Sequence, residues 1–405
     1  MMAIDSAPPR GVSPLAPELA TCLATIDANR VAFGNGYPDD TTRDGHYPLR
    51  PATGSRPAGS NGGWTTGFWP GLLWLAWELT GDDGYRLDGE RCLRDFARRI
   101  DDEVELDTHD LGFLYTLSCV APWRLTGDDL GRRTALRAAE LLAARLLEPA
   151  GIIQAWGDLD DPARRGQAII DSLMNMPLLY WAAAVGGQPR PAVIAYRHTV
   201  QLRDHILRPD DTTYHTFFWD PRTGEALRGA TAQGYADDSC WARGQAWGIY
   251  GFALAHAHSG DPSMISAARR CADYFLAHLP DDGVPYWDLV FPTGSDQPRD
   301  SSATAIAACG LDALARVVPD GDAARYRAAA GRLLDALAAH CVPAHPGPGS
   351  PLLLHAVYDE PSGVGVDEGC LWGDYFYLEA LVRRASPGWT SPWEAGAVPG
   401  RRPSA

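Results

Sequence analysis

Lysine is absent from this chain of 405 residues. All 35 basic residues are arginine, which excludes a P-loop lysine, a Schiff-base lysine and a lysine general base. The net charge of -16 and the pI near 5.0 argue against nucleic acid or an anionic membrane surface as a partner, because both require clustered positive charge. An anionic small substrate stays open, since a few arginines can concentrate positive charge locally.

Paired cysteines and long apolar runs are also missing. The eight cysteines stand singly, with no CxxC and no histidine at metal-ligand spacing, so we expect buried thiols in a reducing compartment. No segment approaches an uninterrupted apolar span of about 20 residues, and the N-terminus lacks a basic region followed by an apolar one. These observations predict a soluble, cytoplasmic protein.

Helical patterns recur along the chain between two ends rich in proline and small polar residues. We expect disordered or flexible tails over residues 1–14 and 386–405, and one domain over 15–385, because no composition break marks a linker. Strand signals are sparse, and the runs 213–218 and 284–289 are expected to form small β-hairpins in loops. The predicted helices span residues 16–32, 64–79, 85–100, 111–125, 130–147, 171–186, 191–207, 239–259, 262–279, 301–317, 322–341 and 371–384.

Unusual polar and aromatic residues fall at or just before the start of every second predicted helix. Their spacing, roughly 45 to 70 residues, is the length of a helical hairpin plus its loop. A closed ring of such hairpins explains this pattern, because its inner helices would be parallel and would all open at one end. The sequence therefore predicts an all-α (α/α)6 barrel, with an open α-solenoid as the alternative. The positions are Trp64, Asp110, Asp171, Asp237, Asp300 and residues 368–372.

The densest stretch of such residues is QGYADDSCWARGQAWGIYGFAL, residues 233–254. In a helix that begins near residue 239, Asp237 and Asp238 can cap the N-terminus, and Arg243 and Trp247 share one face. A helix stripe that mixes arginine, glutamine and indole suits a polar ligand with apolar ring faces, and sugars fit that description.

Two aspartates admit two interpretations. Asp110 lies in DTHDLGFLY, and Asp171 lies in IIDSLMNMPLLYWAA. Each could simply cap a helix, because aspartate at a helix start accepts backbone N–H bonds. Alternatively, they form a pair for general acid–base catalysis, with one carboxyl protonated and the other ionised. Capping lowers the pKa of a carboxyl, so an acid at Asp171 needs desolvation or a neighbouring negative charge, which Asp110 could supply.

Aromatic and polar residues repeat at the same predicted helix starts. Core packing explains any single tryptophan, but several around one cup favour stacking platforms for pyranose rings. His109 and His215 fit a structural role and a ligand contact equally well. The other candidates are Trp64, Trp156, Gln233, Trp241, Arg243, Trp247 and Trp372.

Several segments jointly resemble the unsaturated glucuronyl hydrolases of glycoside hydrolase family 88. They are spread from 60 to 385 and include GGWTTGFWPGLLWLAWELTGD, THDLGFLY, IIDSLMNMPLLYWAA and WARGQAWGIYGFAL. The resemblance implies an (α/α)6 barrel without a metal or organic cofactor. It also implies release of a non-reducing-terminal Δ4,5-unsaturated uronic acid from oligosaccharides that polysaccharide lyases produce. Unsaturated rhamnogalacturonyl hydrolases share the barrel and the paired aspartates, and they match these strings less well.

The same resemblance implies roles for individual residues. Asp171 would protonate C4 of the enol ether and then help water add at C5, Asp110 would assist from the other side, and Arg243 would contact polar groups of the uronate. Some family members hold a sulfated amino sugar through a cluster that includes lysine, so the lack of lysine argues against sulfated chondroitin-type substrates. The residues implied to line the −1 subsite are Trp64, His109, Trp156, His215, Gln233, Arg243 and Trp247.

Two other functions stay open at this stage. An inverting glycosidase could use Asp110 and Asp171 on a saturated glycosidic bond, and a barrel of this kind could also bind sugars without catalysis. The linkage, the +1 sugar and the oligomeric state are not specified by the sequence.

Overall fold

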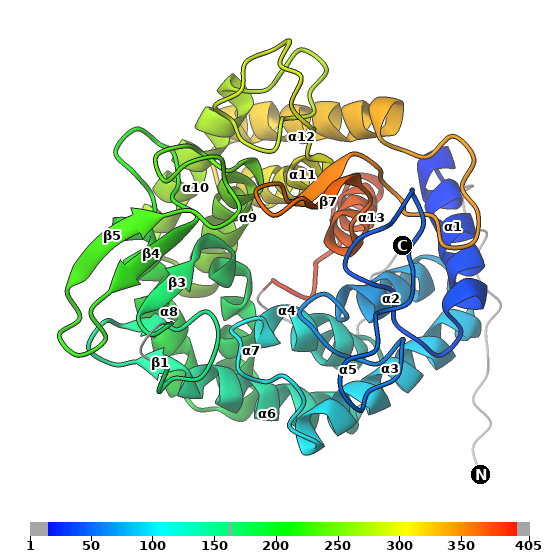
Figure 1. Cartoon of the computed structure of the whole chain (residues 1–405), viewed down its shortest axis with the longest axis horizontal. Helices are drawn as coiled ribbons and strands as arrows, with labels where there is room; N and C mark the ends of the chain where they lie inside the picture. Colours follow the sequence, from blue (N-terminus) through cyan, green and yellow to red (C-terminus); the bar gives the residue numbers. More distant parts are fainter. Residues whose placement is uncertain (1–14, 162–163, 395–405) are drawn as a thin grey trace.

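A computed structural model of the protein describes residues 15–161 and 164–394, and its helices form a ring (Figure 1). Each inner helix contacts the next one along the ring, and the last, α13, contacts the first, α2, so the ring is closed. The predicted (α/α)6 barrel is therefore confirmed, and the open solenoid is excluded. The inner helices are α2 (Phe68–Thr80), α4 (Leu111–Tyr115) with its π-helical extension η1 (Thr116–Val120) and α5 (Ala121–Thr126), α7 (Met176–Gly186), α9 (Ala242–Ser259), α11 (Ser301–Ala315) and α13 (Leu371–Ala385).

The outer helices alternate with the inner ones along the chain and surround them. All twelve predicted helical segments are present, with boundaries that differ by a few residues. The outer helices are α1 (Pro17–Phe33), α3 (Asp83–Asp101), α6 (Asp129–Ala144), α8 (Arg190–His205), α10 (Pro262–Ala277) and α12 (Asp320–His340).

The difference between the layers follows from burial. The outer helix α3 buries one stripe and exposes a charged one, whereas in α9 every residue from 242 to 255 is buried. A helix enclosed on all sides must be apolar around most of its circumference. Small residues then allow neighbouring helices to approach closely. A Cβ added at Gly310 of α11 would lie 2.8 Å from the Tyr250 nitrogen of α9.

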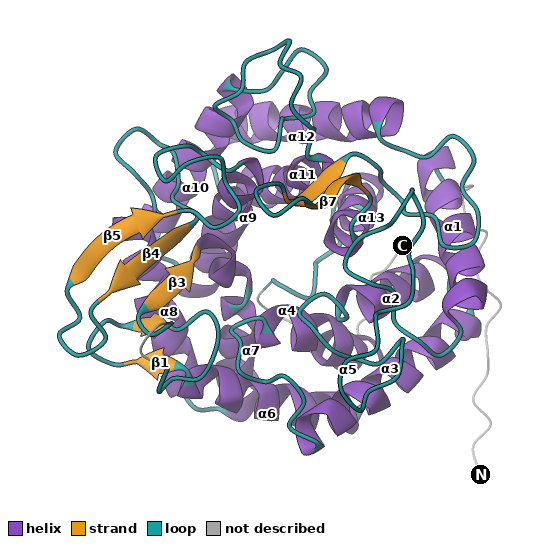
Figure 2. Ribbon diagram, in the orientation of Figure 1, coloured by secondary structure: helices purple, strands orange, loops and turns teal. Residues whose placement is uncertain are grey.

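Three small antiparallel sheets decorate the loops on the rim of the barrel, where Figure 2 shows most of the strands on one side. The predicted strand at 213–218 is confirmed in part by β4. The predicted strand at 284–289 is wrong, since that run makes only isolated bridges. The strands are β1 (Leu146–Leu147) with β2 (Ile152–Ile153), β3 (Gln167–Ile169) with β4 (Thr216–Trp219) and β5 (Ala226–Ala230), and β6 (Ala356–Asp359) with β7 (Val364–Glu368).

The segment after α13, residues 386–394, crosses the middle of the ring in Figure 1 (red), and we call it the C-terminal plug. Trp393 is fully buried, packs nearly parallel to Phe376, and donates from Nε1 to Glu379 Oε2 at 3.0 Å. Trp389 is 3 % exposed. The expectation of a flexible tail is therefore wrong for residues 386–394. The expected tails at 1–14 and 395–405 lie outside the described residues.

Because the plug follows the C-terminal end of α13, it enters the ring from the end opposite the inner-helix N-termini, and Trp393 reaches Phe113 of α4, with 6.0 Å between the ring centroids. Within residues 15–161 and 164–394, no helix is both long enough and apolar enough to span a membrane.

Candidate active site

The two aspartates lie at the N-terminal ends of neighbouring inner helices. Asp110 immediately precedes α4, and Asp171 lies in the 3-10 turn η2 (Ile170–Met174) that leads into α7. Asp110 occupies the N-cap position of α4, and Asp171 lies in the first turn of η2, but neither helix start has a side-chain capping bond. Asp171 is oriented by the strand before it: Ile169 pairs with Thr216 in β4, and the Ile170 N–H donates to the His215 carbonyl at 3.0 Å.

The segments that carry the two aspartates touch each other. A Cβ added at Gly112 would lie 2.2 Å from the Asn175 Cα, so only glycine allows this approach. The Phe113 N–H donates to Asn175 Oδ1 at 2.8 Å and joins the start of α4 to the end of η2. The THDLG and IIDSLMN motifs therefore meet through their backbones, which brings both carboxyls to one place.

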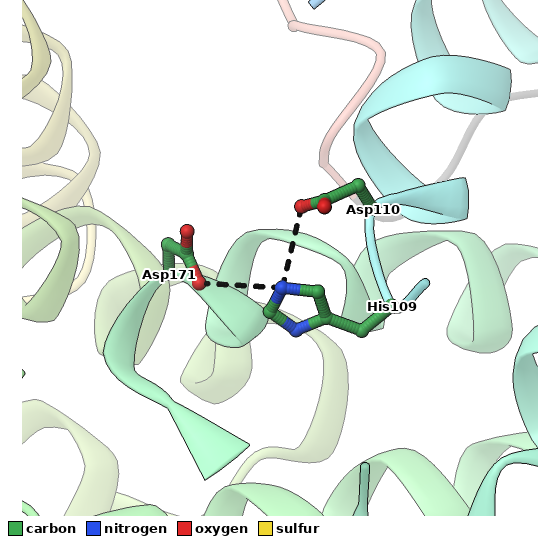
Figure 3. Close-up of side chains that lie close together, drawn as sticks. All are labelled: His109, Asp110 and Asp171. Carbon is green, nitrogen blue, oxygen red and sulfur yellow. Dashed lines mark ion pairs between the residues drawn. The ribbon is translucent and has the colours of Figure 1, made fainter. Parts of the chain in front are cut away.

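Figure 3 shows both carboxyls directed toward the same ring nitrogen of His109. His109 Nε2 lies 3.3 Å from Asp110 Oδ1 and 3.6 Å from Asp171 Oδ1. His109 is fully buried, and the side chains of Asp110 and Asp171 are 7 % and 14 % exposed. Within the described part of the chain, the His109 ring nitrogens and Asp171 Oδ1 are buried without a hydrogen-bond partner. Unpaired buried polar atoms of this kind are uncommon and mark the cluster as a candidate functional site.

Burial and mutual repulsion separate the ionisation of the two carboxyls. Burial raises the pKa of Asp110 to about 6, although the hydrogen bond from Thr108 Oγ1 to Asp110 Oδ2 at 2.6 Å acts in the opposite direction. Burial, and then the negative charge of Asp110, raise the pKa of Asp171 well above its usual range. Burial lowers the pKa of His109 to about 3, so its imidazole is neutral. The environment thus favours the protonated form of Asp171 beside a negative charge on Asp110.

His109, Asp110 and Asp171 also have the spacing of a metal site, with one ligand atom from each lying within 4.8 Å of the others. A metal ligand must be deprotonated, whereas the environment of Asp171 favours its protonated form. The cluster therefore fits a proton-sharing pair better than a set of metal ligands.

Closely packed aromatic rings form one wall beside the pair. Trp64 is half-buried, packs 5.1 Å from Trp372 between ring centroids, and donates from Nε1 to Tyr358 Oη at 2.9 Å. On another side, Trp156 lies edge-on to His109 at 6.4 Å. The half-buried Trp64 and Trp156 are placed to contact a sugar ring.

His215 and Gln233 belong to the loops before α9. His215 Nδ1 accepts the backbone N–H groups of Ala232 and Gln233 at 3.0 and 3.1 Å, so a neutral ring carries its proton on Nε2. Burial lowers the pKa of His215 to about 3, which keeps the ring neutral. His215 is therefore both a structural residue and a possible donor to a ligand.

Arg243, for which the family resemblance implies a contact with the uronate, is held by several protein groups. Its guanidinium is 2 % exposed and pairs with Asp300 at 3.1 Å, and it donates to the Val357 and Tyr358 carbonyls of β6. It also stacks on Trp241, 4.3 Å from the ring centroid. Both terminal nitrogens thus already have protein partners, and Arg243 holds the β6 segment, with its Tyr358, against α9.

Other residues of the stretch 233–254 are structural as well. Trp241 is 3 % exposed and lies between His215 and Arg243, and Trp247 is 1 % exposed and packs on Phe113. These two rings support the site from behind and do not present a free face. The prediction that Asp237 and Asp238 cap α9 is wrong, because Trp241 is the N-cap and makes no side-chain capping bond. Asp237 instead accepts the Thr231 N–H at 2.8 Å.

Sequence reasoning missed Tyr358 and the pairing of Arg243 with Asp300. Tyr358 lies on β6, for which no strand was predicted. Asp300 caps α11 through the Ser302 and Ala303 N–H groups, and its other oxygen contacts Arg243. Charge alone could have suggested a counterion for a buried arginine, but only the fold identifies which acid provides it.

A closed ring of helical hairpins whose inner N-termini surround a buried carboxyl pair and packed aromatic rings defines an (α/α)6-barrel glycoside hydrolase. The sequence pattern of Glycosyl Hydrolase Family 88 matches residues 50–358. The chain belongs to this family. The prediction of a glycoside hydrolase of the unsaturated glucuronyl hydrolase type is confirmed.

Similar proteins include the unsaturated chondroitin disaccharide hydrolase of Streptococcus pyogenes serotype M1, which is 44 % identical over 90 % of each chain. The crystal structure of the unsaturated glucuronyl hydrolase of Bacillus sp. GL1 superimposes with a TM-score of 0.87 at 40 % identity, and the match covers 94 % of this chain and 99 % of that one. A D175N mutant of the Streptococcus agalactiae enzyme, complexed with dGlcA-GalNAc6S, matches with a TM-score of 0.81 at 38 % identity, over 93 % of this chain and 92 % of that one.

Proposed function

We propose that the protein removes a Δ4,5-unsaturated glucuronic acid from the non-reducing end of lyase-generated oligosaccharides by hydrating its enol-ether double bond. The observation that carries this proposal is the environment of Asp171. Burial and the neighbouring Asp110 raise its pKa well above the usual range, and its Oδ1 lies beside His109 without a hydrogen-bond partner among the described residues. Hydration of an electron-rich double bond requires such an acid and needs no separate nucleophile.

Asp171 and Asp110 take complementary parts in the reaction. The Asp171 carboxyl gives its proton to C4, the double-bond electrons form the new C4–H bond, and positive charge develops at C5 and the ring oxygen. The ionised Asp110 stabilises that charge across a distance of a few ångströms. The Asp171 carboxylate then takes a proton from a water molecule whose oxygen bonds to C5. The resulting hemiketal opens and expels the remaining sugar, and Asp171 is protonated again.

The surrounding residues suit a single pyranose ring. Trp64 and Trp156 offer partly exposed indoles, and the neutral rings of His109 and His215 can donate to hydroxyl or carboxylate oxygens without adding a charge. Arg243 acts mainly by positioning, through Asp300 and β6. Gln233, whose Oε1 lies 3.4 Å from an Arg243 nitrogen, is placed to contact the uronate.

We further propose that unsulfated substrates are preferred. The chain has no lysine, and a cavity of about 450 Å³ beside Tyr358 is lined by more acids than bases. Its charged residues are Asp39, Asp40, Asp44, Glu368 and Arg43. A sulfate on the +1 sugar would meet net negative charge there, in contrast to the Streptococcus agalactiae enzyme crystallised with dGlcA-GalNAc6S.

A cytoplasmic location is proposed from the cysteines. All eight are free and buried, which fits a reducing compartment.

The test is turnover of unsulfated and 6-sulfated unsaturated disaccharides in ¹⁸O-labelled water. Loss of the enoate absorbance with label at C5, and faster turnover of the unsulfated sugar, is the expected result. Label at C1 with the absorbance retained would instead indicate an inverting glycosidase acting on the anomeric carbon. Asp171→Asn should retain binding and lose nearly all turnover. Binding without turnover by the unmodified protein across the panel would indicate a sugar-binding barrel.

A further inference from the structure

A buried histidine on an outer helix makes a second connection between the segments that carry the active-site residues. His198 of α8 is fully buried, and both of its ring nitrogens have partners. Its Nδ1 accepts the Ile153 N–H of β2 at 2.9 Å, and its Nε2 lies 2.7 Å from Ser172 Oγ. No other side chain on α8 makes a hydrogen bond to η2 or β2 among the residues that the structure describes.

The hydrogen-bond directions define one tautomer. Because a backbone N–H can only donate, Nδ1 of His198 carries no proton, and the neutral ring holds its proton on Nε2. This Nε2–H donates to Ser172 Oγ, and the Ser172 hydroxyl donates to the Ile169 carbonyl at 2.5 Å. In a charged imidazolium, Nδ1 would also carry a proton, and this N–H would point at the N–H of Ile153. Two donors cannot form a hydrogen bond, so only the neutral ring of His198 fits its surroundings. Burial also lowers the pKa of His198 to about 3.

The two ends of this hydrogen-bond chain lead to the active site. Ser172 directly follows Asp171 in η2. Ile153 begins an extended segment in which the Ala155 carbonyl accepts the His109 N–H at 2.8 Å. His198 therefore connects the turn that carries Asp171 with the segment that supports His109, from behind the site and without contact to the substrate.

We propose that His198 is a positioning residue for the reaction, which sets the separation of Asp171 from His109 and Asp110 by holding Ser172 and Ile153 at a fixed distance. This inference rests on the proposed function, because it assigns His198 to the proton transfer by Asp171. A misplacement of about 1 Å in such a group costs on the order of 10²-fold in rate. The rigid, singly protonated imidazole suits this task, since it accepts on one side and donates on the other.

Two substitutions separate the two bonds of His198. His198→Asn keeps an oxygen near the Nδ1 position for the Ile153 N–H and is too short to reach Ser172. His198→Gln reaches Ser172 and loses the acceptor for Ile153. For each we expect kcat on an unsaturated disaccharide to fall at least about tenfold, with KM within about twofold, because substrate binding is unchanged while the proton donor is misplaced. The basic limb of the pH profile should also move to lower pH, as Asp171 becomes less confined and its pKa falls.

Ser172→Ala tests the same connection from the other end and makes a smaller change, so it decides the matter if either histidine variant fails to fold. The double variant Ser172→Ala with His198→Asn should lose no more activity than the worse single variant, because both remove one interaction. The matched control is His205→Asn on the same helix, whose ring packs against Phe217 and Trp219. It should keep the parent kcat and pH profile.

The positioning role is overturned if folded His198→Asn and Ser172→Ala keep the parent kcat and pH limbs. It is also overturned if the loss of activity in these variants equals the unfolded fraction measured by thermal melting, while both limbs of their pH profiles stay where they are in the parent. A failure of the proposed function looks different, because the unmodified protein would then leave the enoate absorbance unchanged. If the parent enzyme turns over its substrate and the His198 and Ser172 variants match the parent, the proposed function stands and only the inference about His198 is wrong.

Discussion

Replacing Asp110 by asparagine isolates the electrostatic relation between the two carboxyls. The substitution preserves size, and an amide oxygen can still accept the bond from Thr108, so the change removes mainly one negative charge. In the parent enzyme we expect a bell-shaped pH profile. Activity is lost below about pH 6 as Asp110 is protonated, and it is lost at high pH as Asp171 gives up its proton.

The size of the effect follows from the distance. Ligand atoms of the two carboxyls lie within 4.8 Å of each other. At an effective dielectric constant of about 20, repulsion at that distance is about 3.5 kcal/mol. Asp110 raises the pKa of Asp171, so Asp110→Asn should lower that pKa and move the basic limb toward low pH. The acidic limb should disappear, because asparagine does not titrate.

The assay is kcat/KM from the loss of enoate absorbance between about pH 4 and 9. We also expect the maximal rate to fall by about 10² to 10³, since the developing positive charge loses its counterion. Asp107→Asn is the control, because this side chain lies three residues earlier and is 83 % exposed. A variant that retains the acidic limb, or whose basic limb stays within half a unit of the parent, would refute the assignment of the proton to Asp171.

Three further predictions concern the framework of the site. Gly112→Ala should lower kcat at least about tenfold, because its Cβ would lie 2.2 Å from the Asn175 Cα and push the two aspartates apart. Trp393→Ala in the C-terminal plug should lower the free energy of unfolding by about 3 to 5 kcal/mol in urea titrations, since it removes a fully buried indole. Asp300→Asn should lower it by about 3 to 5 kcal/mol as well, because Arg243 would be left buried without its counterion.

Each of these predictions has a matched control. Gly331→Ala on α12 adds a Cβ with no atom within 4 Å and should keep the parent kcat, while Tyr235→Ala removes a side chain that is 61 % exposed and should cost little stability. Equal kcat for the two alanine variants would contradict the close contact at Gly112. A Trp393→Ala protein as stable as the Tyr235→Ala protein would show that the plug does not contribute to the fold. An Asp300→Asn protein with unchanged stability would mean that Arg243 is hydrated.

The helices and their order could be predicted because an amphipathic or apolar period is a local property of the chain. The closed ring was predicted from spacing, because unusual residues recur at the start of every second helix. If these helices are the parallel inner helices of a ring, their starts all lie at one end of the barrel. Asp110 and Asp171 stood out for the same reason. The C-terminal plug could not be predicted in this way, because its Pro- and Ser-containing sequence is typical of a tail, and only its contacts with the inner helices explain the burial of Trp389 and Trp393.

Long-range contacts decided the rest of the site. Nothing near Arg243 in the sequence indicates that its partners are Asp300 and the carbonyls of β6, so its expected role as a ligand contact differed from the contacts in the structure. His198 lies in an ordinary outer helix and has no local feature that marks it. Its importance follows from which backbone N–H and which hydroxyl the fold brings to its two nitrogens.

The sequence by itself determined the barrel, the family resemblance and the two carboxyls, since these depend on periodicity, spacing and residue type. The sequence assigned the proton to Asp171 only through the family resemblance, and the tertiary structure supplies the physical reason for that assignment. A pKa depends on desolvation and on the distance to other charges, and those quantities exist only once α4, η2 and the buried His109 have come together.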